Sequence, residues 1–156
     1  MKEWFKYEFG YVNIDSENLY LTSSGNWSEI KDLKEKTKQV ANKNDNKSSS
    51  ILGFIIVSLS LLVFLIIKNF ISGKVGLTLV LIAIGGGYKL YEYMKSEIGA
   101  KFKIPLTKIT AIKENDKSIE IIFINGEGKT DNYKLHRVEN KGIKIVTSLK
   151  QYIVQK

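Results

Sequence analysis

The stretch ILGFIIVSLSLLVFLII, residues Ile51 to Ile67, is seventeen residues long and carries no charge, although the chain around it is rich in Lys and Asn. A bilayer core of about 30 Å requires about 20 mostly apolar residues in a helix, with a range of about 17 to 25. The run meets the lower limit by itself, and the neutral residues 48–50 and 69–71 lengthen it. The stretch therefore predicts a transmembrane helix.

A second apolar run, VGLTLVLIAIGGGYKLY, follows at residues 75–91. Its one charge, Lys89, lies near its end, where a long side chain can reach the lipid headgroups. The connector KNFISGK, residues 68–74, contains a Ser-Gly pair that favours a tight reversal of the chain. The sequence thus predicts a transmembrane helical hairpin over residues 51–91, with helices at 51–70 and 75–91.

Two other interpretations of these runs are disfavoured. A helix of a soluble protein needs a polar face, which neither run has, and the flanking chain is too small to bury both helices. A secretion signal is disfavoured because the first fifty residues contain no apolar core and the first run lies deep in the chain. We therefore expect lipid to surround both helices.

The placement of lysines predicts the orientation of the hairpin. Five lysines closely precede the first run and three follow the second, whereas the connector holds two. The positive-inside rule counts Lys and Arg near the ends of the spans. We therefore expect an integral protein of the cytoplasmic (inner) membrane with two spans and both termini in the cytoplasm.

Gly85, Gly86 and Gly87 lie within the second run. Adjacent small residues let two helix backbones approach closely, and a kink or hinge in a conducting pathway is the alternative. Neither run carries Asp, Glu, Arg or His in its middle, where ion and proton pathways usually have them. The three glycines are therefore predicted to pack the helices together, and a channel or transporter is disfavoured.

The N-terminal residues 1–41 have the pattern of a strand pair followed by an amphipathic helix. Apolar side chains alternate with polar ones at first, and apolar side chains then recur at helical spacing after Asn26, a residue suited to cap a helix. The predicted elements are strands at residues 5–11 and 19–22, a helix over residues 27–40, and a polar linker over residues 42–50. Trp27 and the aromatic side chains of the first strand are expected in the core, and the helix is expected on its own sheet, with the bilayer surface as the alternative.

The C-terminal residues 92–156 have the pattern of a β-meander followed by an amphipathic helix. Pro105 lacks an N–H donor and therefore favours an edge strand. Ile122 and Ile124 make the segment SIEIIFIN apolar on both faces, so this segment is predicted to be central. The predicted elements are strands at residues 102–106, 109–112, 118–125 and 130–136 and a helix over residues 138–152.

Neither polar end is large enough to fold alone. A single hydrophobic core in a domain of fewer than about 70 to 80 residues gives only marginal stability without cross-links. The chain has no cysteine to form disulfides. A hairpin would bring residues 50 and 92 close together at one membrane surface, which lowers the entropic cost of joining the two ends. We therefore expect residues 1–41 and 92–156 to pack as one small α+β domain.

The stretch FKIPLTKITAIKENDKSIEIIFIN, Phe102 to Asn125, resembles the bacterial membrane-tethered pleckstrin-homology-like proteins. In that family a two-helix transmembrane hairpin adjoins a small cytoplasmic β-domain, and the pattern polar-Ile-Pro-Leu-x-x-Ile leads into a strand hairpin. The resemblance covers about two-thirds of the chain as an order of elements. It implies a transmembrane hairpin that carries a pleckstrin-homology-like domain, an antiparallel sheet with a C-terminal helix, and it implies no catalytic residue.

No catalytic, cofactor-binding or metal-binding residue is predicted. The absence of cysteine excludes thiolate metal sites and cysteine nucleophiles, and the one histidine, His136, has no recognisable catalytic partner. Four lysines near the predicted membrane surface are candidate contacts for anionic lipid headgroups, with ordinary surface charge as the alternative. They are Lys89, Lys95, Lys101 and Lys103.

These patterns favour a membrane-anchored, non-enzymatic binding or scaffold module that presents its domain at the cytoplasmic face. The expected partners are the lipid bilayer with its anionic headgroups and a protein of unknown identity or a second copy of the chain. Nucleic acid is not expected, because the sequence has no recognition motif and tethering restricts access. Two alternatives are a pore-forming or immunity-type small membrane protein and an accessory subunit of a transporter or secretion complex.

Overall fold

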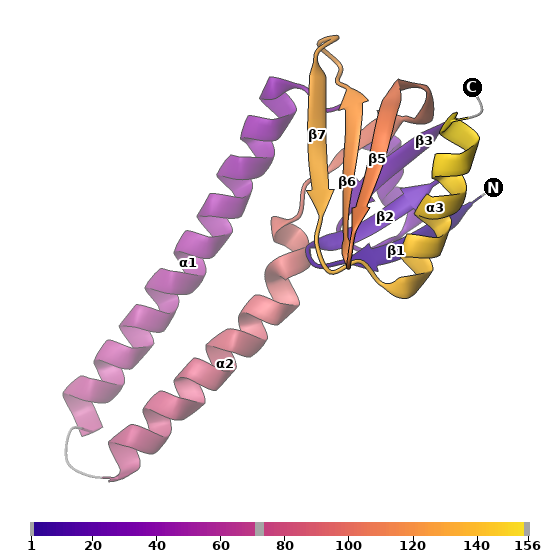
Figure 1. Cartoon of the computed structure of the whole chain (residues 1–156). Helices are drawn as coiled ribbons and strands as arrows, with labels where there is room; N and C mark the ends of the chain where they lie inside the picture. Colours follow the sequence, from indigo (N-terminus) through magenta and orange to yellow (C-terminus); the bar gives the residue numbers. More distant parts are fainter. Residues whose placement is uncertain (1, 71–73, 155–156) are drawn as a thin grey trace.

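The first sheet joins the two ends of the chain. In the computed structural model, which describes residues 2–70 and 74–154, it consists of β1 (Glu3–Tyr7), β2 (Gly10–Ile14), β3 (Asn18–Thr22) and β4 (Phe102–Pro105), all antiparallel and in this order (Figure 1). β3 pairs with β4 so that Leu21 lies opposite Phe102 and Asn18 opposite Pro105. Pro105 therefore lies in an edge strand, where its missing N–H breaks no inner ladder.

The second sheet comes entirely from the C-terminal part of the chain. It consists of β5 (Ile109–Asn115), β6 (Ser118–Ile124) and β7 (Thr130–Leu135), with β6 in the centre as its apolar sequence predicts. Ile119, Ile121 and Phe123 alternate along β6 and are buried, whereas the residues between them are half-buried. The pleat thus directs every second side chain of β6 into the core.

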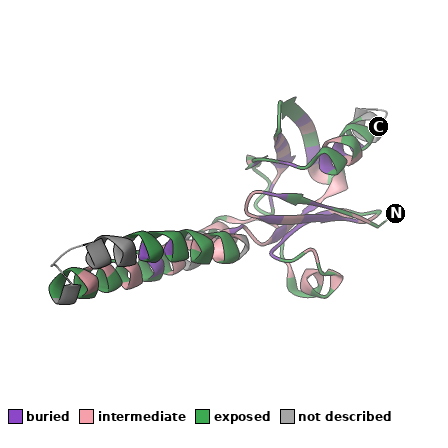
Figure 2. Ribbon diagram, turned by 90° about the horizontal axis from the view of Figure 1, so that it is seen from below, coloured by how far each residue is buried: buried purple, intermediate pink, exposed green. Residues whose placement is uncertain are grey.

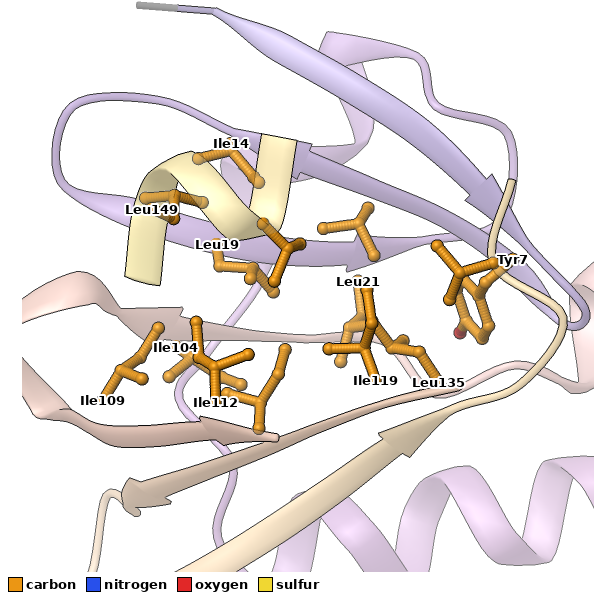
Figure 3. Close-up of a cluster of buried hydrophobic side chains, with 14 of the residues drawn as sticks. Tyr7, Ile14, Leu19, Leu21, Ile104, Ile109, Ile112, Ile119, Leu135 and Leu149 are labelled. Carbon is orange, nitrogen blue, oxygen red and sulfur yellow. The ribbon is translucent and has the colours of Figure 1, made fainter. Parts of the chain in front are cut away.

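The core lies between the two sheets and beneath the last helix, α3 (Asn140–Val154) (Figure 3). Figure 3 shows side chains of both sheets and Leu149 of α3 pointing toward one another. α3 contacts β1 and β5, which are edge strands of the two sheets, and it therefore closes one side of the domain. Residues 33–37 run along the opposite side, where the Lys103 N–H donates to the Lys34 carbonyl and the Gly126 N–H to the Lys36 carbonyl, both at 2.9 Å.

Two long helices extend from one end of this domain. α1 (Lys38–Phe70) and α2 (Lys74–Ile98) lie side by side and antiparallel (Figures 1 and 2). Because α2 leads directly into β4, the helical pair is inserted between β3 and β4 of one sheet. The start of α1 and the end of α2 are therefore both attached to the domain.

The predicted fold class was wrong. The sequence predicted a two-span transmembrane hairpin with a pleckstrin-homology-like domain, whereas the structure is a mixed α+β fold with two antiparallel sheets. Among the described residues one helix, α1, has a segment long and apolar enough to cross a membrane, Ser48–Lys68 with 21 residues. The predicted location with two spans is therefore not supported.

A physical reason for this correction lies in the second apolar run. Its uncharged part between Lys74 and Lys89 has fourteen residues. A helix of that length is about 21 Å long, which is shorter than the roughly 30 Å of a hydrocarbon core. From Lys89 to Ile98 the helix also carries Glu92, Lys95 and Glu97.

The structure also differs from the predicted elements near the N-terminus. Residues 5–11 form a hairpin of β1 and β2 instead of one strand, and the predicted helix over residues 27–40 is reduced to a short 3-10 helix, η1 (Trp27–Asp32). The predicted polar linker over residues 42–50 belongs to α1, which begins at Lys38. The Val40 N–H donates to the Thr37 side chain at 3.2 Å, so Thr37 caps a helix that the polar residues then continue.

Candidate functional site

Among the residues whose side chains the structure describes, α1 has the largest number of exposed large apolar side chains. Phe54 is 66% exposed and Val57 is 68% exposed, and the exposed face continues around the helix (Figure 2). The large apolar side chains of α1 that are exposed are Phe54, Ile56, Val57, Leu61, Leu62, Phe64, Leu65 and Ile67. Soluble monomers rarely expose a contiguous apolar patch of this kind, and such patches mark protein or membrane contacts.

The contact between α1 and α2 uses one of the three predicted packing glycines. Gly87 is buried, and a Cβ placed there would overlap the side chain of Leu59. Ile55 of α1 and Ala83 of α2 are buried as well. Gly85 and Gly86 are exposed, and a Cβ at either position would meet open space. Gly87 therefore lies in the contact between the two helices, against the Leu59 side chain, and its two neighbours do not.

The base of the helical pair is joined closely to the domain. The Gly99 backbone touches the Phe9 carbonyl so closely that no side chain fits there, and the Asn44 side chain donates to the Lys101 carbonyl at 3.4 Å. A cavity of about 160 Å³ remains at this junction, lined by Phe9, Asn44, Ser48, Ile98, Gly99, Ala100 and Tyr133. The helices therefore leave the domain at a position that backbone contacts define.

A buried tyrosine lies beside this junction. The Tyr7 hydroxyl is buried beside Tyr133, and a Cβ at Gly99 would lie 3.2 Å from it. Burial raises the pKa of Tyr7 far above its usual value, and the neighbouring Tyr133 adds to this rise. Tyr7 therefore stays neutral, and its ring serves the core.

A groove of about 340 Å³ lies between α2 and the outer side of the first sheet. It is lined by Lys6, Glu8, Gly10, Tyr11, Ser23, Ser24, Glu92, Tyr93 and Lys95. Both acids have a cation of their own, since Lys95 lies 2.8 Å from Glu92 and Arg137 lies 3.1 Å from Glu8. Lys6 lies 5.9 Å from the ring centre of Tyr11. Lys6 therefore adds positive charge to a groove whose acids are already neutralised.

Aromatic and basic side chains alternate on the outer face of β1 and β2. Trp4 is 45% exposed, its ring centre lies 5.9 Å from that of Tyr11, and the Lys141 ammonium lies 4.7 Å from the Trp4 ring centre. The Lys2 ammonium lies 5.3 Å from the Trp27 ring centre. The expectation that Trp27 belongs to the core is thus not met, because Trp27 is half-buried and lies outside the core cluster.

The four lysines predicted to contact headgroups lie in different surroundings. Lys95 lines the groove, and Lys89 is exposed on α2. Lys101 pairs with Glu97 at 3.1 Å, and Lys103 belongs to β4. Sequence reasoning missed Lys6 and Tyr93 as partners of Lys95, because the contact between α2 and the first sheet joins segments about ninety residues apart. The signal in the sequence that could have identified this surface is the N-terminal strand, which has Lys and aromatic side chains at its outward positions.

The sheet face next to the groove is held by a buried polar network. The Asn13 side chain accepts from the Thr22 hydroxyl at 2.9 Å and donates to the Gly25 carbonyl at 2.8 Å. Glu29 accepts from the Ser23 N–H at 2.9 Å and from the Ser24 hydroxyl. Burial raises the pKa of Glu29, but these hydrogen bonds lower it by more, so its pKa lies below the usual value. The loop after β3 is thereby fixed beside Tyr11.

The potential metal ligands are dispersed in the part of the chain that the structure describes. No group of three His, Cys, Asp or Glu side chains lies where it could hold a metal ion, in residues 2–70 and 74–154. His136 is exposed, and its backbone carbonyl accepts from the Glu8 N–H at 2.9 Å. No protein-family model, no curated protein and no solved structure matches this chain, so the resemblance to the membrane-tethered pleckstrin-homology-like proteins remains a prediction.

Proposed function

We propose that the protein is a membrane-anchored, non-enzymatic binding module. In this proposal α1 is inserted in a lipid bilayer, and the α+β domain at the base of the helical pair presents a binding surface. The exposure of the apolar side chains of α1 is the observation that carries the proposal. Burial of one large apolar side chain is worth about 1.5–3 kcal/mol. These eight side chains of α1 are about half exposed, so leaving them in water disfavours an aqueous location by about 6–12 kcal/mol.

The distribution of lysines supports a cytoplasmic position of the domain. Five lysines lie between residues 34 and 47, directly before the apolar segment of α1. Positive residues next to an anchoring helix favour the cytoplasmic side. Since β3 and β4 pair in one sheet, the residues before α1 and those after α2 lie in the same domain. Both ends of the chain therefore lie on the side of the membrane where the domain lies.

The binding surface of the module is the outer face of β1 and β2 around Trp4, beside the groove. Trp4 is exposed there next to the Tyr11 ring and the Lys141 ammonium. Exposed aromatic side chains next to cations are typical of binding surfaces. The ring provides apolar contact area for the partner, and the cation provides an oriented electrostatic contact. A protein or a second copy of the chain is the proposed partner of this surface.

Extraction of membranes at alkaline pH tests the anchor. The full chain is expected to stay in the membrane pellet. Arg at the centre of an inserted helix costs about 2.5–3.5 kcal/mol. The double variant Val57→Arg/Leu61→Arg is therefore expected to move to the supernatant. The matched variant Asn115→Arg/Ser148→Arg places the same charges on exposed positions of the domain and is expected to stay in the pellet.

The proposal fails if the wild-type chain remains in the supernatant as a monomer without detergent. It also fails if both double variants partition alike. Circular dichroism of each variant in mild detergent shows whether the fold is retained, so that release from the membrane is not confused with unfolding.

A further inference from the structure

We infer that the groove between α2 and the first sheet binds the phosphate of a phospholipid headgroup of the bilayer that holds α1. The inference rests on the proposed membrane anchor and adds a lipid site to it. Lys6 and Lys95 are the residues assigned to the phosphate, and Tyr11 and Tyr93 flank it.

The first argument is the level at which the groove lies along the axes of α1 and α2. Gly87 of α2 lies against Leu59 of α1, and the two helices are antiparallel. Lys95 is eight residues beyond Gly87, so it lies about 12 Å nearer the domain, level with Ile51 of α1. Ile51 is the first residue of the uncharged run of α1. The groove therefore opens at the depth where a bilayer around α1 changes from hydrocarbon to headgroups.

The charge of the groove is the second argument. Glu92 is paired with Lys95 and Glu8 with Arg137, while Lys6 has no acidic partner among the ion pairs of the described residues. A phosphodiester carries one negative charge, which matches the charge that Lys6 contributes. The Glu92–Lys95 pair is partly exposed, with 41% of the Glu92 side chain and 21% of the Lys95 side chain exposed, so Lys95 can share its ammonium between Glu92 and a phosphate at little cost. A lysine near an anionic membrane surface contributes about 1 kcal/mol.

The aromatic side chains at the mouth of the groove are the third argument. Tyr93 is 85% exposed, and nothing in the described domain covers it. Tyrosine is enriched at the membrane interface because its ring is apolar and its hydroxyl is polar. Tyr93 is level with Gly53 by the same helix register, two residues inside the start of the apolar run. Its exposure in water is thus explained if headgroups surround it.

A lipid suits this groove better than a soluble phosphate ester does. The groove is open and its cations are partly solvated, so it offers a free phosphate few desolvated contacts. A headgroup of the surrounding bilayer is held next to the groove by its own acyl chains, which gives it a high effective concentration there. Weak contacts are sufficient under this condition.

Thermal unfolding of the purified full chain in a neutral detergent tests the inference, with Trp4 and Trp27 as the fluorescent reporters. The probes are dioctanoyl phosphatidylglycerol, dioctanoylglycerol without phosphate, and glycerol 3-phosphate without acyl chains. We expect the first probe alone to raise the Tm. The concentration for half of this rise is expected to increase about fivefold for Lys6→Gln and again for Lys95→Gln. Lys113→Gln and Lys134→Gln, at exposed positions of β5 and β7, are the matched controls.

Each outcome decides the inference. An equal rise with dioctanoylglycerol, or an unchanged response of the double variant Lys6→Gln/Lys95→Gln, overturns it. An equal rise with glycerol 3-phosphate shows a site for soluble phosphate esters and overturns the lipid assignment. Membrane extraction separates this failure from failure of the anchor. A chain that stays in the pellet without a phosphate effect lacks the groove site only, whereas a chain that leaves the pellet lacks the anchor itself.

Discussion

The Lys36 ammonium lies 2.8 Å from a carboxylate oxygen of Asp131, and this ion pair ties the segment before α1 to β7. The ammonium also donates to the Asn132 carbonyl at 3.0 Å and lies 5.7 Å from the ring centres of both Phe102 and Phe123. Only 16% of the Lys36 side chain is exposed. A partly desolvated cation with two oxygen partners and two rings is worth more than an ordinary surface pair. Lys36 thus closes the side of the domain opposite α3.

Substitution of Lys36 by methionine tests how much this ion pair contributes to stability. Lys36→Met keeps much of the aliphatic stem but leaves the Asp131 carboxylate without its cation. We expect the free energy of unfolding to fall by about 1–3 kcal/mol, measured as a lower Tm in mild detergent. Lys113→Met, at an exposed position of β5, is the control and is expected to stay near the wild-type Tm. Equal values for the two variants would show that the tie contributes nothing.

Acid is expected to weaken the ion pair between Lys36 and Asp131. Partial burial raises the pKa of Asp131, but hydrogen bonds from Lys36 and from the Asn132 N–H lower it by more, so its pKa lies below the usual 3.8. The unfolded chain therefore takes up a proton at Asp131 at a higher pH than the folded chain does. The stabilisation is complete above the unfolded pKa and is lost as the pH falls through the lower folded pKa.

A pH series of Tm values measures this effect. We expect the wild-type Tm to fall below about pH 4, and we expect a smaller fall for Asp131→Asn, which cannot titrate. Asp116→Asn removes a carboxylate from an exposed turn and serves as the matched substitution. If Asp131→Asn loses as much Tm as the wild type between about pH 5 and about pH 2, Asp131 is not the group responsible.

Local patterns in the sequence predicted much of the domain. Alternation of apolar residues predicted β4, and the apolar character of both faces of SIEIIFIN agrees with the central place of β6 in the second sheet. The position of Pro105 agrees with an edge strand. These features depend on near neighbours in the chain, which a single sequence displays.

Features that depend on distant contacts were not predictable in the same way. The start of α1 at Lys38 depends on Thr37 and on Glu127, whose carboxylate accepts from the Lys38 N–H at 2.7 Å. The role of Gly87 rather than Gly86 depends on the rotation of α2 against α1. The two apolar runs look alike in composition, but the charges from Lys89 onward shorten the uncharged part of the second. Counting that part would have corrected the prediction of two spans.

Valine at position 87 or 86 is expected to separate the two glycines by their contacts. At position 87 the added side chain would overlap Leu59, whereas at position 86 it would point into open space. Because both variants change helix propensity equally, the difference between them reports the interface. We expect Gly87→Val to unfold more easily than Gly86→Val by about 1–3 kcal/mol. Circular dichroism of the helices during heating measures it, and identical curves would contradict the proposed role of Gly87.

Alanine at position 142 is expected to destabilise the packing of α3 on the first sheet. A Cβ there would lie 2.7 Å from a ring carbon of Phe5 and 2.7 Å from a methyl carbon of Val138, and both residues are buried. Overpacking of a core costs about 1–3 kcal/mol and outweighs the gain of about 1 kcal/mol in helix propensity. We therefore expect Gly142→Ala to lower the Tm, whereas Lys144→Ala, on the exposed face of α3, changes it little.

A second substitution distinguishes overpacking from a general defect of α3. Phe5→Leu removes the ring that the Cβ at position 142 would meet, so the two changes are expected to compensate in part. The loss of stability in Gly142→Ala/Phe5→Leu should then be smaller than the sum of the two single losses, by about 0.5–3 kcal/mol. Strictly additive losses would mean that the methyl group added at position 142 is accommodated without contact with Phe5, and the close approach of α3 to β1 would then need another explanation.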